Sequence, residues 1–134
     1  MNSEKQRLDL LILGDSPAGQ AGLGYAQDQG VRVLLETRVV AQICRMQDGW
    51  RIVGADWHWQ ARAVLLTSDT LALWKMAGGA VVRNPVLRHD VPLPGDLPGI
   101  EVAGTALGIK GEDGARKSGR FRARKLLRAL DSAP

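Results

Sequence analysis

A turn of small residues follows the first apolar run of the chain, and its composition suits a phosphate site. The turn contains Gly14, Ser16, Pro17, Ala18 and Gly19. Gly14 permits a sharp bend, and Gly19 lets the following helix approach the preceding strand closely. Proline suits the first turn of that helix because it has no N–H group to leave unpaired. A pyrophosphate would then lie on the remaining N–H groups, at the positive end of the helix dipole.

Ser16 stands where the G-x-G-x-x-G fingerprint of dinucleotide-binding turns has its second glycine. That glycine normally lets the backbone approach phosphate without a Cβ atom in the way. Serine is the smallest polar substitute, and its hydroxyl group can donate a hydrogen bond to phosphate. The same pattern also fits a tight strand-to-helix connection that binds no ligand. The turn alone leaves both interpretations open.

Glu36 follows the second apolar run, Val31–Leu35. Its separation from Gly19 is close to that expected for the acidic residue that binds a ribose hydroxyl group. Between the two runs, residues 17–28 are predicted to form a helix that Gly30 closes. The first 36 residues therefore predict one strand–helix–strand unit with a dinucleotide site.

A second glycine turn follows the last predicted strand, Ile100–Ala103, and contains Gly104, Thr105 and Gly108. A long helix is predicted after it, from about Glu112 to Leu130. The strand completes a parallel sheet with residues 8–13, 31–35 and 62–67. Ligands gather at the carboxyl ends of such strands, so the two glycine turns are expected to converge at one edge.

The space between the two glycine turns distinguishes a dinucleotide site from a connection that binds no ligand. One shared, open groove favours a bound dinucleotide. A groove plugged by Trp74 or Tyr25 favours a fold without a ligand.

Short alternating runs between the second and third parallel strands predict a three-stranded antiparallel meander. The runs are residues 39–45, 50–53 and 57–60. Trp50, Trp57 and Trp59 are expected to cover one side of it as packing residues. Further on, residues 71–76 predict a helical turn and residues 80–82 a short strand. Residues 84–99 contain four prolines and predict an extended connection.

The positive charge of the chain belongs to one segment. The net charge is +4, and residues 116–128 contain seven Lys or Arg and no acid, so the rest of the chain is net negative. Nucleic-acid binding through this helix is one interpretation. A solvated helix face, or a docking face for an acidic partner, is favoured, because Phe121 is the single aromatic residue among the basic ones. We therefore expect no nucleic-acid partner.

The remaining reactive side chains predict no catalytic residue and no metal site. Cys44 is the single cysteine and is expected to be an inert buried thiol. His58 and His89 are expected to be packing or surface residues. No stretch predicts a transmembrane segment or a leader, which favours a cytoplasmic protein.

Three motifs, taken in order, resemble the FAD domain of the pyridine-nucleotide-disulfide oxidoreductase class. LDLLILGDSPAGQAG is similar to the N-terminal FAD fingerprint. The segment from GVRVLLETRVV to RAVLLTSD is similar to the part that carries a strand, the meander and the return strand. LPGIEVAGTALGIKG and the helix after it are similar to the C-terminal FAD motif. Within the class, the chain most resembles the FAD subunit of heteromeric dye-linked amino-acid dehydrogenases, opine oxidases and hydrogen cyanide synthase.

The resemblance implies an α/β, Rossmann-like FAD-binding domain. It has about four parallel strands, an antiparallel three-stranded meander and two main helices. The implied parts are a βαβ unit at 8–36, the meander at 38–60, return strands and connection at 61–105, and a glycine turn with its helix at 106–131. FAD is the implied cofactor, ahead of NAD(P). The implied cofactor-binding residues are Gly14, Ser16, Pro17, Ala18, Gly19, Glu36, Gly104, Thr105 and Gly108.

The chain departs from the family pattern in ways that shape the expected function. The family's second strand with its helix, its nicotinamide-binding domain and its redox-active cysteine pair are missing. The family's Gly-Asp pair is replaced by Gly104-Thr105. If the residues around Glu36 are aligned with the family, Glu36 follows a different strand from the one that carries the ribose-binding acid. We expect an FAD-binding subunit or domain of a flavin-dependent oxidoreductase complex, exchanging electrons with another subunit or working as a homodimer. The alternative is a non-catalytic assembly subunit that keeps the fold without the cofactor.

Overall fold

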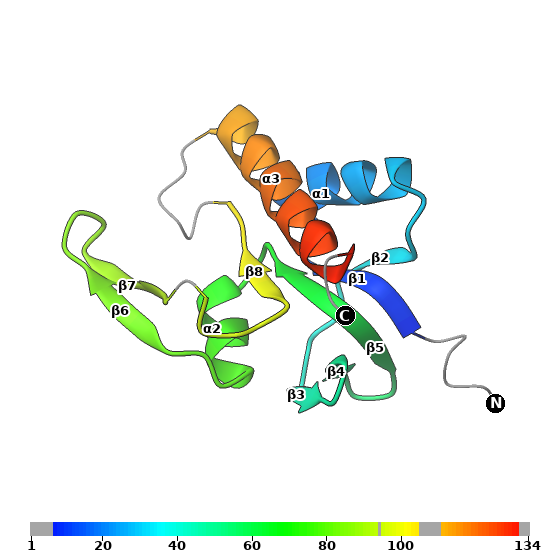
Figure 1. Cartoon of the computed structure of the whole chain (residues 1–134). Helices are drawn as coiled ribbons and strands as arrows, with labels where there is room; N and C mark the ends of the chain where they lie inside the picture. The colour runs from blue at the N-terminus through cyan, green and yellow to red at the C-terminus, as the bar shows by residue number, and fades with distance from the viewer. Residues whose placement is uncertain (1–6, 94, 105–110, 132–134) are drawn as a thin grey trace.

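The computed structural model describes residues 7–93, 95–104 and 111–131, which form eight strands and three helices (Figure 1). The strands are β1 Arg7–Leu13, β2 Val33–Glu36, β3 Gln42–Met46, β4 Gly49–Val53, β5 His58–Leu66, β6 Val81–Asn84, β7 His89–Pro92 and β8 Ile100–Val102. The helices are α1 Pro17–Asp28, α2 Thr70–Met76 and α3 Glu112–Asp131. Both main helices begin at the predicted residues.

Six of these strands form one sheet in the order β2-β1-β5-β4-β3, with β8 paired to β5 beside that path. β1 runs parallel to β2 and to β5, and β8 runs parallel to β5. The predicted set of four parallel strands is therefore confirmed. β3, β4 and the first part of β5 are antiparallel and form the predicted meander.

β5 corrects the predicted boundary between the meander and the return strand. Residues 57–60 and 61–67 were expected to be separate strands, but residues 58–66 form one continuous strand. One edge of β5 pairs with β1. The other edge pairs first with β4, over residues 58–61, and then with β8, over residues 64–66. No turn residue interrupts the sequence from Trp59 to Leu66, so the backbone stays extended throughout.

The parallel strands separate two layers of apolar side chains. In β1, Leu10 and Ile12 pack on the side of α1 and α3, whereas Leu11 and Leu13 pack on the side of α2 and the meander. All four are buried, because successive side chains of a strand point to opposite faces. This agrees with the prediction that β1 is buried on both faces. Figure 1 shows α1 and α3 lying side by side over the sheet.

The three tryptophans of the meander all pack on the layer that contains α2. Trp50 is buried, and its indole N–H donates to the carbonyl of Pro98 at 3.0 Å. Trp57 and Trp59 are partly buried against the same cluster. Their predicted place on one side of the meander is confirmed.

The proline-rich region is more structured than the sequence indicated. β6 and β7 form an antiparallel hairpin that extends to the side of the main sheet (Figure 1). The amide oxygen of Asn84 accepts the N–H groups of Val86 and Leu87 at 2.9 and 3.0 Å, which shapes the turn. Residues 84–99 are therefore not simply an extended connection. Asparagine before proline favours a turn, so the short hairpin has a local cause.

Candidate functional site

A cavity of about 480 Å³ lies where the two glycine turns meet. Residues of four segments line it: Ser16, Pro17, Ala18, Thr67, Gly104, Gly111, Glu112 and Ala115. This volume is in the range of sites for small molecules. The start of α1, the end of β5, the end of β8 and the start of α3 thus converge at the carboxyl edge of the parallel strands, as predicted.

The two outer glycines of the first turn are required by close packing. Gly14 has φ +114° and directs its α-hydrogen at the side chains of Thr67 and Ser68, which a Cβ atom would overlap. A Cβ atom on Gly19 would overlap the carbonyl oxygen of Gly14 and lie 2.8 Å from the Thr67 hydroxyl. Both glycines therefore shape the turn, and neither side chain position opens into free space.

The hydroxyl group of Ser16 caps α1. It accepts the N–H of Gly19 at 3.3 Å and donates to the carbonyl of Thr67 at 3.1 Å. Serine is a favoured residue at this position, because it satisfies an N–H group that the first helical turn leaves unpaired. The proton that a phosphate would accept is thus committed to Thr67. A ligand that uses the hydroxyl as a donor has to displace that bond.

At the start of α1, the backbone N–H of Ala18 is available to a ligand. Pro17 has no N–H, and the N–H groups of Gly19 and Gln20 donate to the side chain and the carbonyl of Ser16. This leaves the N–H of Ala18 without an acceptor among the residues that the structure describes. An anion in the cavity would receive this group together with the positive end of the α1 dipole.

The start of α3 brings a second helix N-terminus to the cavity, but with acidic side chains. Glu112 lines the cavity and pairs with Arg116 at 2.8 Å on the exposed surface. Asp113 lies beside it in the first turn. Acids stabilise the N-terminal end of a helix, and the same charge opposes a phosphate group nearby. The electrostatics of the two helix ends therefore differ.

Gly104 links the two turns. Its N–H donates to the Ser118 hydroxyl at 3.2 Å, and its φ of +97° places it against Ala18, whose Cβ would lie 3.5 Å from an added Cβ. Ser118 is not among the residues that the sequence motifs indicate. Ser118 and Gly119 are two small neighbouring residues in the middle of a basic helix. Such a pair in the sequence indicates a position where the helix packs closely. The predicted residues Thr105 and Gly108 lie outside the described residues.

Glu36 lies at the end of β2, beside the first turn, with its carbonyl accepting the N–H of Gly14 at 3.0 Å. Its carboxylate does not line the cavity and is 6 % exposed. The guanidinium group of Arg38 binds it at 2.7 Å, the indole N–H of Trp59 donates to it at 2.9 Å, and two backbone N–H groups complete the set. The hydrogen bonds from Arg38, with smaller contributions from Trp59, lower the pKa of Glu36 from 4.5 to about 2.

This arrangement matters for the predicted ribose contact. The carboxylate oxygens of Glu36 already accept hydrogen bonds from Arg38, Trp59 and the following backbone. Arg38 is itself stacked over the ring of Trp57, with 4.8 Å to the ring centroid. A ribose hydroxyl group would have to compete with these partners. Sequence spacing places the acid correctly but does not reveal Arg38 as its partner.

The cavity is not plugged by either candidate aromatic residue. Trp74 is buried in the layer of α2, where its indole N–H donates to the carbonyl of Ala80 at 2.7 Å. Tyr25 packs on the other side, against the cluster beneath α1. Neither Trp74 nor Tyr25 is among the residues that line the cavity. An unplugged groove is the arrangement expected for a bound dinucleotide.

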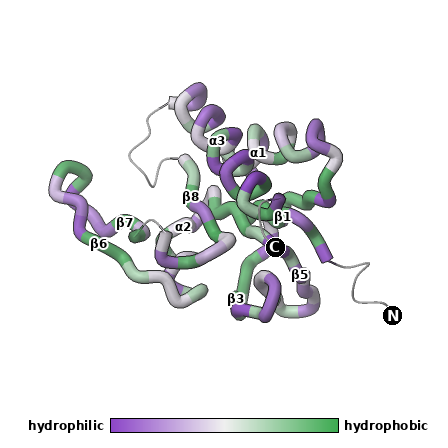
Figure 2. The backbone as a smooth tube through the Cα atoms, viewed as in Figure 1, coloured by the Kyte–Doolittle hydropathy of each residue, from purple (hydrophilic) through white to green (hydrophobic). Residues whose placement is uncertain are grey.

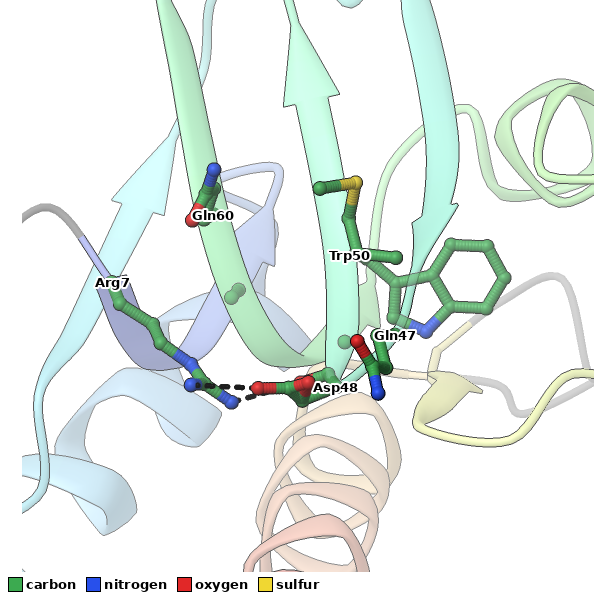
Figure 3. A pocket seen from close by; sticks show the side chains of 8 residues that line it. Arg7, Gln47, Asp48, Trp50 and Gln60 are labelled. Atoms are coloured by element: carbon green, nitrogen blue, oxygen red, sulfur yellow. Dashed lines mark hydrogen bonds and ion pairs between the residues drawn. The ribbon is translucent and has the colours of Figure 1, made fainter. Parts of the chain in front are cut away.

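Two other cavities lie at the opposite end of β5, around the turn between β3 and β4. The larger, of about 460 Å³, extends to the C-terminal half of α3. The smaller contains the ion pair of Arg7 and Asp48 at 3.1 Å, which Figure 3 shows beside Trp50 and Gln60. These charges already have partners, so the carboxyl edge of the sheet remains the candidate site.

The described residues contain no group of three histidine, cysteine or acidic side chains that could hold a metal ion. Nor does any described helix combine the length and apolar character needed to cross a membrane.

Solved structures of three reductases share the fold. Bacillithiol disulfide reductase from Staphylococcus aureus matches with a TM-score of 0.74 at 9 % identity, over 91 % of this chain and 98 % of that one. Thioredoxin reductase from Streptococcus pyogenes gives 0.70 at 9 %, over 96 % and 99 %. A ferredoxin-flavin thioredoxin reductase from Clostridium acetobutylicum gives 0.66 at 8 %, over 95 % and 99 %. No protein-family model and no curated protein sequence matches the chain.

At these identities the likeness concerns the fold alone. The chain has the Rossmann-like α/β fold of thioredoxin-reductase-type proteins, and the predicted fold class is confirmed. The finer resemblance, to FAD subunits of amino-acid dehydrogenases, stays a prediction.

Proposed function

We propose that the cavity between the two glycine turns holds the pyrophosphate of FAD. The chain is then the FAD-binding subunit or domain of a flavin-dependent oxidoreductase complex, with NAD(P) as the less favoured cofactor. The observation that carries the proposal is the convergence of two helix N-termini and Gly104 on one open cavity. One protein of the same fold, from Clostridium acetobutylicum, has flavin in its name.

The fit of the residues to FAD is good for the pyrophosphate and weaker elsewhere. The N–H of Ala18 and the dipole of α1 favour an anion in the cavity. Residues 14–19 are assigned to the pyrophosphate and residues 104–108 to the ribityl chain. Glu36 is assigned to the adenosine ribose, which it reaches by giving up part of its bonding to Arg38.

Bound flavin supplies the redox chemistry. The chain's own residues bind and orient it: the first turn positions the pyrophosphate, and α3 packs against that turn where Gly119 meets the backbone of Ala18. No described side chain in the cavity is a histidine or cysteine. We therefore assign proton and electron transfer to the flavin and to a partner subunit.

A flavin-retention assay tests the proposal. Purified protein is mixed with FAD, desalted, and its visible absorption is measured, together with affinity from the quenching of flavin fluorescence. A retained flavin band is the expected result. A protein that takes up no FAD would contradict the proposal.

Two substitutions of Ser16 make the assay specific to the first turn. Aspartate and asparagine have similar size and are both good N-cap residues, so both keep α1 capped. Ser16→Asp adds a negative charge at the pyrophosphate and is expected to weaken FAD binding at least about tenfold relative to Ser16→Asn. Equal affinities of the two variants would place FAD elsewhere.

Three features favour the second candidate, a non-catalytic assembly subunit. The Ser16 hydroxyl is committed to Thr67, the carboxylate of Glu36 is neutralised by Arg38, and Glu112 adds negative charge to the cavity rim. Each is what a fold retained for assembly alone would tolerate. A colourless protein that forms a stable complex with other subunits would support this candidate.

A further inference from the structure

The long helix α3 has one face that points away from the sheet and α1. Its buried face contacts the sheet and α1 through Ala115, Ser118, Gly119, Ala123, Leu126 and Leu127. The opposite side carries Lys117, Arg120, Phe121, Arg124 and Arg128, which recur at spacings of three and four residues and so share one face. We call these five residues the basic face. All five are exposed, and Figure 2 shows hydrophilic residues recurring along α3.

The basic residues of α3 fall into two groups with different roles. Arg122 and Lys125 pair with Glu101 of β8 at 2.9 and 3.4 Å, and Arg116 pairs with Glu112. These three stabilise the fold or the helix start. Within residues 7–93, 95–104 and 111–131, Lys117 and Arg120 make no ion pair, and the same holds for Arg124. Lys117, Arg120 and Arg124 thus hold positive charge that forms no ion pair with the described part of the chain.

An apolar side chain lies in the middle of this charge. Phe121 is 59 % exposed, with the guanidinium group of Arg122 5.4 Å from its ring centroid. A single exposed apolar residue needs no explanation on its own. Its position between Arg120 and Arg124 on the same face is different, because aromatic residues and arginine are the residue types enriched at the centres of protein interfaces.

Charge decides between a protein and a nucleic acid as the occupant. Outside residues 116–128 the chain is net negative, and Asp113 extends acid to the start of the same helix. A long nucleic acid would meet repulsion beyond the helix, whereas an acidic patch of helix length matches the basic face alone. An apolar pocket for Phe121 is also a feature of protein surfaces.

We propose that the basic face of α3 docks an acidic protein partner, with Phe121 as its apolar anchor. The proposal goes beyond the proposed function, because docking does not require a bound flavin. It is consistent with it, since α3 begins at the cavity rim with Glu112. A partner on this helix therefore lies beside the proposed cofactor site.

Two model polyanions separate the charge of the basic face from its aromatic residue. Fluorescently labelled poly-L-glutamate and a glutamate–leucine copolymer are titrated with the full chain at fixed ionic strength. The triple variant Lys117→Gln, Arg120→Gln, Arg124→Gln is expected to bind both polymers about tenfold more weakly. Phe121→Ser is expected to weaken binding of the copolymer only, by about threefold.

A matched control removes the same net charge from elsewhere. Arg51, Lys75 and Arg83 are exposed residues of β4, α2 and β6, and none lies on the basic face. Their triple replacement by glutamine is expected to change either affinity by less than about twofold. An equal loss in the control and the test variant would overturn the proposal, because net charge alone would then explain binding. Failure to bind either polymer would overturn it as well.

Duplex DNA is the third probe. DNA that binds more tightly than the copolymer at the same salt, and loses affinity in the test variant, would assign the basic face to nucleic acid and overturn the proposal. Flavin retention is measured on the same samples. A chain that binds no FAD but binds the copolymer through the basic face contradicts the proposed cofactor and leaves the docking proposal in place.

Discussion

α1 and α3 lie side by side on one face of the sheet, but they are built on different principles. α1 has no acid in its first turn and no base in its last, and its buried residues are all alanine or glycine. α3 starts with two acids, continues with seven bases and buries larger side chains near its end. The first helix is defined by shape and the second by charge. A pyrophosphate suits the uncharged end of α1, and a protein partner suits the charged side of α3.

The largest effect is expected where shape is most restricted. Gly19→Ala places a Cβ atom against the Gly14 carbonyl and the Thr67 hydroxyl, so α1 has to move from the sheet. We expect a loss of about 3 kcal/mol in the free energy of unfolding, measured by urea denaturation. The control is Gly24→Ala in the same helix, where nothing lies within 4 Å of the added atom. Alanine there is expected to stabilise the protein, by up to about 1 kcal/mol.

The crossing of the two helices gives the next effect. A Cβ atom on Gly119 would overlap the backbone of Ala18, which cannot move aside without disturbing the cavity. Gly119→Ala is expected to cost about 2 kcal/mol and to weaken FAD retention. A Cβ atom on Gly22 comes closest to the flexible end of the Leu65 side chain, at 2.9 Å, and lies at an ordinary contact distance of 3.4 Å from the Gly119 carbonyl oxygen. Gly22→Ala should cost clearly less; equal losses would mean that the helices can separate freely.

The buried carboxylate beside the first turn provides a test by pH. Glu36→Gln keeps the shape and removes the charge that Arg38 and Trp59 bind, and we expect a loss of about 2 kcal/mol at neutral pH. The pKa of Glu36 is lowered from 4.5 to about 2, so its charge stabilises the fold above pH 4.5. That contribution disappears as the pH falls from 4.5 towards 2.

The measurement is the difference in unfolding free energy between the protein and Glu36→Gln across that pH range. The difference should shrink as the solution becomes more acidic. A difference that stays constant would show that the charge of Glu36 does not carry the effect.

The smallest effect concerns the acid at the cavity rim. Glu112→Gln removes a negative charge beside the proposed pyrophosphate, and we expect FAD to bind about threefold more tightly. Asp131→Asn, at the other end of α3, is the matched control and should leave FAD affinity unchanged. Tighter binding in both variants would indicate a general effect of net charge on FAD.

Much of the fold was predictable because its signals are local. The first turn combines a strand, a glycine and a proline at the helix start, and α1 has the predicted bounds. The long helix was marked by acids at its start and an apolar stripe. β5 was divided wrongly because its first half alternates and its second half is fully apolar. The change of pattern reflects a change of neighbours, from the half-exposed meander to the buried centre of the sheet.

The candidate site was predictable in position but not in chemistry. Spacing located Gly14, Gly19 and Gly104 but could not show that the Ser16 hydroxyl is bound to Thr67, 51 residues away. Of the three glycines of α1, Gly19 and Gly22 lie at close contacts, whereas Gly24 faces open space, and the sequence alone does not separate them. The pairing of Arg38 with Glu36 depends on a backbone bend at residue 38, for which the sequence has no local signal.

The continuity of β5 has a consequence for how the molecule opens. This strand pairs with β1 on one edge and with both β4 and β8 on the other, so the meander and the parallel strands share it. Neither region can lose its hydrogen bonds to β5 without exposing the strand on which the other depends. Amide hydrogen exchange should therefore find the centre of β5 among the slowest-exchanging segments, with the meander and the parallel strands opening as one cooperative unit.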